Sequence, residues 1–181
     1  MLSRVEKFEA ALAQTECDAV LVTNLKNIYY LTGFSGTEAT VFISKNRRIF
    51  LTDARYTLIA KGVVQGFDIV ETRDAIGEIV KIITDDKLQK IGFDDEISYA
   101  YFKMLESVFS AYELVPMTAF IENLRMIKDE QEIATIRKAC QISDQAFLDV
   151  LDFIKPGETT ELAVMNFLDA RMRQLGASGA S

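Results

Sequence analysis

The sequence has 181 residues, 49% of them hydrophobic and 10% aromatic, and its 20 basic and 27 acidic residues give a formal net charge of −7. This composition is typical of a chain that folds around a core, and the acidic balance argues against binding to nucleic acid or to an anionic membrane surface. The sequence contains no histidine, which excludes Ser-His-Asp and Cys-His catalysis and leaves carboxylates as the ligands of any zinc or manganese hydrolase site.

The first residues mix charged and apolar positions, unlike a signal peptide, and the longest apolar runs are far shorter than the roughly 20 residues of a transmembrane helix. We therefore expect a cytoplasmic protein. Cys17 and Cys140 are the two cysteines, and no CxxC spacing is present. This pattern favours free thiols over a disulfide framework or a cysteine metal site.

The first two thirds of the chain alternate helical and strand-like patterns. Ser3 and Glu6 have the spacing of a capping box and predict a helix that ends near Thr15. Residues 19–23 predict a buried strand, and residues 39–44 and 48–52 predict an antiparallel hairpin because three residues join them. Further helices are predicted over residues 55–64, 75–83 and 98–109, and further strands over residues 67–72, 90–94 and 112–116. The alternation predicts an α/β fold, a mixed sheet with flanking helices.

The pattern changes after Pro116. Residues 120–127 continue helically, and residues 129–153 carry one long apolar stripe. Residues 155–158 break it, and Thr159 or Thr160 is expected to cap a second helix, giving a helical hairpin. Because two amphipathic helices have little left to cover after a complete-looking α/β unit, we expect a second domain that is cut short by the end of the chain.

Four sequence strings carry a resemblance to a known family. They are NIYYLTGFSG at 27–36, LTDARY at 51–56, LRMIKDEQEI at 124–133 and IKPGETTEL at 154–162. Occurring in this order, they resemble the amino-terminal part of the Xaa-Pro peptidases, the superfamily of prolidase, aminopeptidase P and creatinase. The resemblance covers the whole chain.

The resemblance implies a creatinase-type N-terminal domain of ribonuclease-H-like shape over residues 1–121, followed by the truncated start of a "pita-bread" metallopeptidase domain over residues 122–181. In that family two divalent metal ions, commonly manganese, cobalt or zinc, are held by two Asp, one His and two Glu residues, which would all lie beyond this chain. The fragment is then expected to bind no cofactor and to be inactive alone. It would shape the active-site mouth for a proline-containing peptide, join the missing C-terminal catalytic domain and support a homodimer.

Tyr30, Phe34, Arg55 and Tyr56 are the candidate residues facing the substrate or a domain interface. The aromatic, glycine-rich segment over residues 24–36 is interpreted as a loop that could present its rings, although rings in the core with glycines allowing a turn are the alternative. The Arg55 guanidinium suits a substrate carboxylate or a salt bridge to the catalytic half. Asp53 is expected to cap the helix that follows it.

The acidic run over residues 94–96 is interpreted as a solvated strand end, because consecutive strand residues point to opposite faces and do not converge on one metal ion. A non-catalytic peptide- or protein-binding module on the same scaffold, a pseudoenzyme, is the alternative function. A nuclease is disfavoured by the net charge and by the lack of acidic residues in the strands at residues 19–23 and 42–43. The choice between dipeptidase and aminopeptidase stays open.

Overall fold

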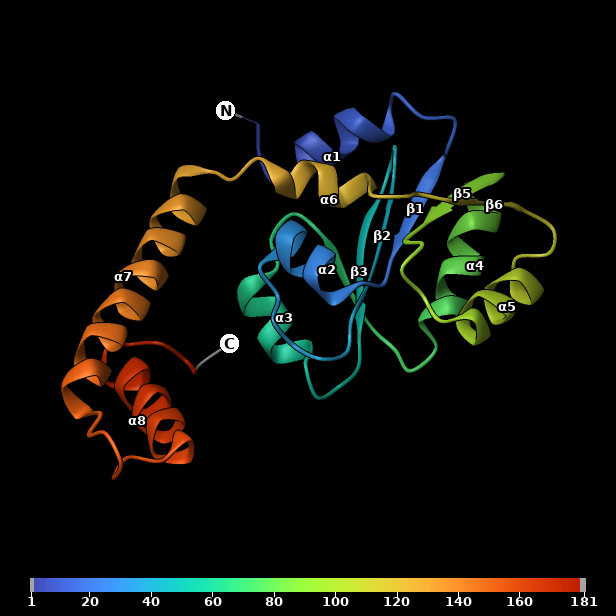
Figure 1. The fold of residues 1–181 in the computed structure, drawn as a ribbon. Helices are drawn as coiled ribbons and strands as arrows, with labels where there is room; N and C mark the ends of the chain where they lie inside the picture. Colours follow the sequence, from blue (N-terminus) through green and yellow to red (C-terminus); the bar gives the residue numbers. More distant parts are fainter. Residues whose placement is uncertain (1, 180–181) are drawn as a thin grey trace. The chain divides into compact units, whose positions relative to one another are not determined.

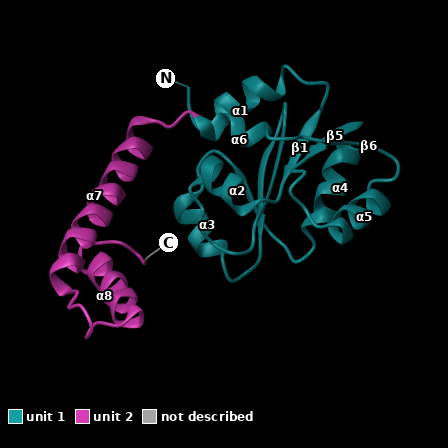
Figure 2. Cartoon of the chain, viewed as in Figure 1, with its two compact units in different colours: residues 1–126 teal, residues 127–181 magenta. Residues whose placement is uncertain are grey.

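The computed structural model of the protein describes residues 2–179, and the chain divides into two compact units after Met126 (Figure 2). The expected domain boundary after Ile121 falls inside a helix of the first unit, and the division comes at the end of that helix. Among the described residues, no helix combines the length and the apolar character that crossing a bilayer requires.

The first unit is built on a mixed sheet of six strands in the order β4-β3-β2-β1-β5-β6. The strands are β1 (Ala19–Val22), β2 (Thr40–Ser44), β3 (Arg48–Thr52), β4 (Asp68–Glu71), β5 (Lys90–Phe93) and β6 (Glu113–Pro116). β2 pairs antiparallel with β1 and β3, and the other neighbouring strands are parallel. The predicted mixed sheet and hairpin are therefore confirmed.

Helices cover both faces of this sheet (Figure 1). On one face lie α1 (Arg4–Leu12), α2 (Leu25–Thr32), α3 (Thr57–Val63) and α6 (Phe120–Met126), and on the other lie α4 (Ala75–Asp85) and α5 (Tyr99–Val108). Central strand β1 shows why both faces need cover: Val20 and Val22 point into the first layer, and Leu21 points into the second. Alternate residues of a strand face opposite sides, so an all-apolar strand lies between two cores.

The segment over residues 24–36 differs from the prediction, because most of it is helix α2 and not a loop. Asn24 caps α2 by accepting the backbone N–H of Lys26 at 2.9 Å, and Gly33 ends it in the left-handed conformation with φ 75°. Ile28 and Leu31, three positions apart, are buried. Because the residues around them are polar and aromatic, the sequence did not show this spacing as a helical apolar stripe.

The second unit is a pair of helices, α7 (Glu130–Phe153) and α8 (Glu161–Gln174), joined by a turn. Asp129 begins α7 with a capping box, and Thr160 caps α8. Between the helices, Arg171 forms an ion pair with Asp149 at 2.6 Å. The pair buries few apolar side chains, and its large exposed ones are Ile136, Phe147, Leu148, Leu151, Phe153, Ile154, Leu162 and Met165.

Candidate functional site

The carboxyl ends of five strands share one edge of the sheet, because β1, β3, β4, β5 and β6 all run in the same direction. In open α/β sheets this edge is where ligands and functional loops gather. The segments after β1 and β3, which carry the four predicted site residues, both leave from it. This edge is therefore the candidate functional site.

Two of the family-like segments meet here through aromatic packing. The ring of Phe34 lies 5.0 Å from that of Phe50 and 5.7 Å from that of Tyr56, both in edge contacts. The hydroxyls of Thr37 and Tyr56 are hydrogen bonded at 2.8 Å. A Cβ added at Gly36 would lie 2.3 Å from Cζ of Phe34, so only glycine lets the backbone pass this close to the ring. Segments 33–37 and 53–56 thus form one packed unit.

Of the four predicted site residues, two belong to the core and two reach the surface. Tyr30 is 5% exposed and Phe34 is 1% exposed. The Tyr30 hydroxyl donates to the carbonyl of Leu124 at 3.4 Å, and its ring lies 5.0 Å beneath the guanidinium of Arg4. Neither ring is presented at the surface of this unit, whereas Tyr56 is half-buried and Arg55 is exposed.

Arg55 is held in place by its neighbours on both sides. Its guanidinium donates to Oδ2 of Asp53 from Nη2 at 2.6 Å and from Nε at 2.9 Å, and it lies 5.5 Å from the centre of the Tyr56 ring. The hydrogen bond from Arg55 holds the pKa of the Asp53 carboxyl below its usual value. The Arg55 side chain is 68% exposed, so part of its donor surface faces solvent.

The prediction that Asp53 caps α3 is wrong. Its Oδ1 accepts the backbone N–H of Arg55 at 2.9 Å, which closes a turn before the helix begins. Tyr56 occupies the N-cap position without a side-chain hydrogen bond. The extra turn after β3 separates Asp53 from the first helical N–H groups, and it places Arg55 at the sheet edge.

A second polar cluster fills the crevice between β1 and β5. Asp94 is 7% exposed, and its carboxylate accepts the backbone N–H groups of Thr23 at 2.7 Å and Asn24 at 2.8 Å. Burial raises the pKa of Asp94 in spite of these hydrogen bonds. The prediction of a solvated strand end is therefore wrong at this residue. The chain leaves β1 and β5 toward opposite faces, and the amide groups left in the crevice need a buried acceptor.

Asn27 links Asp94 to the last helix of the first unit. Its Nδ2 donates to Asp94 at 3.2 Å and to Glu122 at 2.7 Å, and its Oδ1 accepts from Arg125 at 3.0 Å. No sequence pattern groups Asp94, Glu122 and Arg125 with Asn27, because these residues lie far apart in the chain. The network joins the ends of β1 and β5 to α6.

The residues of this chain do not fit the two-metal centre that the family resemblance implies. The sequence has no histidine, and no group of three His, Cys, Asp or Glu side chains in residues 2–179 could hold an ion. Both oxygens of Asp94, the most buried carboxylate of the acidic run, already accept N–H groups. No step of hydrolysis is assigned to the side chains of this chain.

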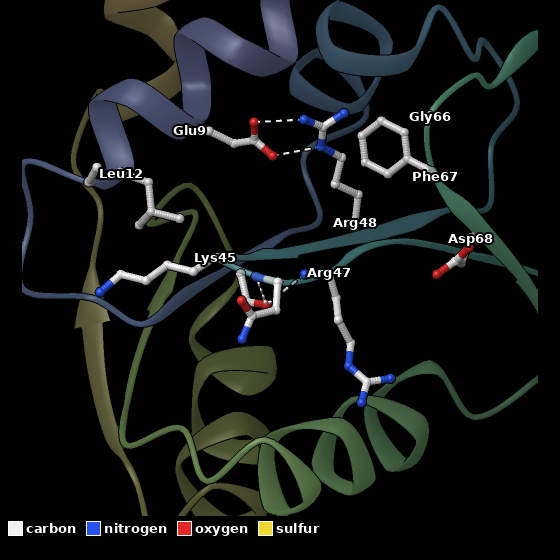
Figure 3. A pocket seen from close by; sticks show the side chains of 11 residues that line it. Glu9, Leu12, Lys45, Arg47, Arg48, Gly66, Phe67 and Asp68 are labelled. Atoms are coloured by element: carbon white, nitrogen blue, oxygen red, sulfur yellow. Dashed lines mark hydrogen bonds and ion pairs between the residues drawn. The ribbon is translucent and has the colours of Figure 1, made fainter.

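A cavity of the first unit is lined by other residues than these (Figure 3). It has a volume of about 700 Å³ and is lined by α1, by the turn between β2 and β3 and by residues 66–68. Arg48 donates to both oxygens of Glu9 at 2.6 and 2.8 Å, and Arg47 donates in the same way to Asp86. The two arginine charges on its wall are thus already paired with carboxylates.

Comparison with known proteins places these features in a family. Residues 4–127 match the family described as the Creatinase/Prolidase N-terminal domain. The chain is 36% identical to the uncharacterized peptidase YqhT of Bacillus subtilis over 98% of its own length and 51% of that protein. It is 23% identical to an Xaa-Pro dipeptidase of Pyrococcus horikoshii over 87% of its length and 44% of that protein. The chain spans about half the length of the curated relatives it matches.

Solved structures agree with these matches. The Xaa-Pro dipeptidase from Bacillus anthracis is 34% identical, with a TM-score of 0.90 over 97% of this chain and 50% of that chain. An aminopeptidase P from Streptococcus thermophilus is 57% identical, with a TM-score of 0.66 over 67% of this chain and 95% of that chain.

Proposed function

The chain belongs to the creatinase/prolidase N-terminal domain family, and on this basis we propose that it is the N-terminal region of a proline-specific metallopeptidase, an Xaa-Pro dipeptidase or aminopeptidase. The observation that carries the proposal is the similarity to the Bacillus anthracis dipeptidase, which extends over 97% of this chain at 34% identity. In this proposal residues 1–121 form the creatinase-type domain, and residues 122–181 begin the metallopeptidase domain. The protein would be cytoplasmic and a homodimer.

The two divalent metal ions, manganese, cobalt or zinc, would be held by residues in the half of the relatives that this chain does not match. They would activate water for attack on the bond before proline and stabilise the charge that develops. The exposed apolar side chains of α7 and α8 support this arrangement, since amphipathic helices bury such faces against further structure in a complete domain.

The part of this chain in the reaction would be to shape the mouth of the active site. Arg55 offers exposed N–H donors from a position fixed by Asp53 and Tyr56. A guanidinium held in this way can bind a substrate carboxylate, or a carboxylate of the catalytic half, without losing much conformational freedom. Tyr56 would position Arg55 through its ring.

A first experiment measures hydrolysis by the chain alone. Purified residues 1–181 should release no proline from Xaa-Pro dipeptides in the presence of manganese, cobalt or zinc ions. Turnover that survives repurification and disappears on chelation would refute the assignment of the chemistry to the missing half.

A second experiment joins residues 1–181 to the unmatched half of the Bacillus anthracis dipeptidase. The chimera should hydrolyse Xaa-Pro dipeptides, and Arg55→Ala in it should lower kcat/KM by roughly 10-fold or more because a charge-assisted contact is lost. Arg47→Ala is the matched control, since Arg47 is engaged by Asp86.

The experiment on the chain alone and the experiment on the chimera answer separate questions. A folded, metal-loaded chimera that binds peptides without hydrolysing them would favour the non-catalytic binding module instead. Unchanged kinetics in Arg55→Ala would refute the role proposed for Arg55.

A further inference from the structure

The carboxyl ends of β3 and β4 open a second crevice. The chain leaves β3 into α3, which packs on one face of the sheet through Ala60. It leaves β4 into α4, which packs on the other face through Ile79 and Ile83. Such divergence between parallel neighbours creates the crevice in which α/β proteins bind ligands. Between β1 and β5 the equivalent space is filled by Asp94, but between β3 and β4 a cavity of about 340 Å³ remains.

Three side chains on this cavity have polar groups without protein partners. Glu38 and Arg73 are exposed, and neither side chain makes a hydrogen bond or ion pair with another residue in the described range 2–179. Thr40 is 8% exposed, and its hydroxyl also has no protein partner within that range. No fully enclosed side-chain oxygen or nitrogen of the described residues lacks a partner, so the Thr40 hydroxyl is open to the cavity.

The charges around the cavity select the kind of ligand. Arg55 and Asp53 also line it and form an ion pair with each other. Arg73 lies close enough to affect the charge of Asp53, and Glu38 that of Arg55, but neither the Arg73 nor the Glu38 side chain forms a hydrogen bond or ion pair of its own in the described range, so both can contact a ligand. A simple anion would be repelled by the two carboxylates, and a simple cation would be repelled by the two guanidinium groups. A molecule that carries both charges pairs with both sides and avoids these penalties. The volume falls within the range of about 300–1,000 Å³ that is usual for small-molecule sites.

We propose that this cavity binds a small zwitterion of the free amino acid class. The carboxylate of the ligand binds Arg73, its ammonium group binds Glu38, and the Thr40 hydroxyl supplies a further hydrogen bond. Ala75, in the first turn of α4, also lines the cavity, and the positive end of the helix dipole favours a carboxylate there. The site uses only residues of the first unit, and it shares Arg55 and Asp53 on its wall with the proposed active-site mouth. Its binding test needs no peptidase activity, so the two proposals can fail separately.

Calorimetric titration of residues 1–181 tests the proposal with L-alanine and L-proline as probes. Both should bind saturably, and acetate, methylammonium and inorganic phosphate should bind at least tenfold more weakly, because each satisfies one charge of the site and is repelled by the other. Absence of saturation by either amino acid at tens of millimolar would overturn the proposal. Binding of acetate or phosphate as tight as that of the amino acids would overturn it too.

Substitutions locate the binding. Arg73→Gln and Glu38→Gln should each weaken amino acid binding by about tenfold or more, since each removes one charge-assisted contact. Thr40→Val should weaken it less, because the bond that it removes is neutral. Arg137→Gln removes an exposed arginine of α7 and should leave the affinity unchanged. Circular dichroism checks that each variant is folded, and wild-type affinity in folded Arg73→Gln or Glu38→Gln would refute the site.

Discussion

Replacing Gly36 with alanine tests whether the two segments at the sheet edge are close-packed. The new methyl carbon would lie 2.3 Å from Cζ of Phe34 and 3.0 Å from Cδ1 of Tyr56, well inside the roughly 3.5–4.0 Å of a favourable carbon contact. Phe34 has little room to move, because it is 1% exposed and also packs on Phe50. Overpacking of a core costs about 1–3 kcal/mol, and the lower entropy of the unfolded alanine chain offsets about 0.4–1 kcal/mol of this. We expect a net loss of about 1–2 kcal/mol in the free energy of unfolding.

Alanine substitutions at two other glycines serve as controls that separate the effect of steric crowding from the effect of backbone conformation. Gly62 in α3 has no atom within 4 Å of an added Cβ, so Gly62→Ala should stabilise the fold by about 0.5–1 kcal/mol through helix propensity. Gly157 has equal space but a φ of +80°, so Gly157→Ala should destabilise the turn between α7 and α8 by about 1–2 kcal/mol. Urea unfolding followed by circular dichroism measures all three, since the sequence has no tryptophan. A Gly36→Ala midpoint at or above that of wild type would refute the packing argument.

Three further predictions concern titratable side chains. Burial raises the pKa of Asp94, so its carboxyl stabilises the fold fully below the unfolded value of 3.8, and this contribution is lost as the pH rises through the folded pKa. The free energy of unfolding of wild type minus that of Asp94→Asn should therefore increase as the pH falls from about 7 to about 4, and a flat or decreasing difference would contradict this. Cys140 should react with a thiol reagent in the folded protein, whereas Cys17, which is 5% exposed and has a pKa raised by burial, should react after unfolding. Peptide mass spectrometry distinguishes the two thiols, and equal labelling rates would contradict the burial of Cys17. Arg55→Ala should leave the urea midpoint nearly unchanged because its ion pair is exposed, and a large decrease would assign Arg55 a structural role.

Sequence patterns predicted the elements whose signals are local. The capping box of Ser3 and Glu6 and the cap at Thr160 are confirmed because an N-cap hydrogen bond needs only residues two or three positions apart. The hairpin of β2 and β3 is confirmed for the same reason, since a short connection forces its strands to pair.

The sequence patterns did not predict helix α2, because the residues that hydrogen bond to its buried asparagine are distant in the sequence. Asn27 is 1% exposed, and its side chain is satisfied by Asp94, 67 positions away, and by Arg125, 98 positions away. In the sequence alone an asparagine beside two tyrosines indicates a turn or loop. The same long-range network explains why Asp94 was expected to be solvated.

The sequence patterns indicated the segments that carry the candidate residues, and the structure shows how each side chain is buried. Segments 33–37 and 53–56 come together at the sheet edge. Phe34 packs inward, as the alternative with the rings in the core expected for an apolar side chain, and Arg55 faces solvent. No sequence pattern marked Glu38 and Arg73 as candidate site residues. They line the same cavity only because the strand order β4-β3-β2 brings their segments together.

The strings that carry the family resemblance mostly perform structural tasks. Gly36 and Phe34 pack the sheet edge, and Arg125 closes the network around Asn27. Asp129 and Thr160 cap the two helices of the second unit. Their polar atoms are engaged in hydrogen bonds within the fold, so these strings predict the architecture more directly than the reaction. In the proposed peptidase, this half would place Arg55 and Tyr56, and the metal chemistry would fall to residues that this chain does not contain.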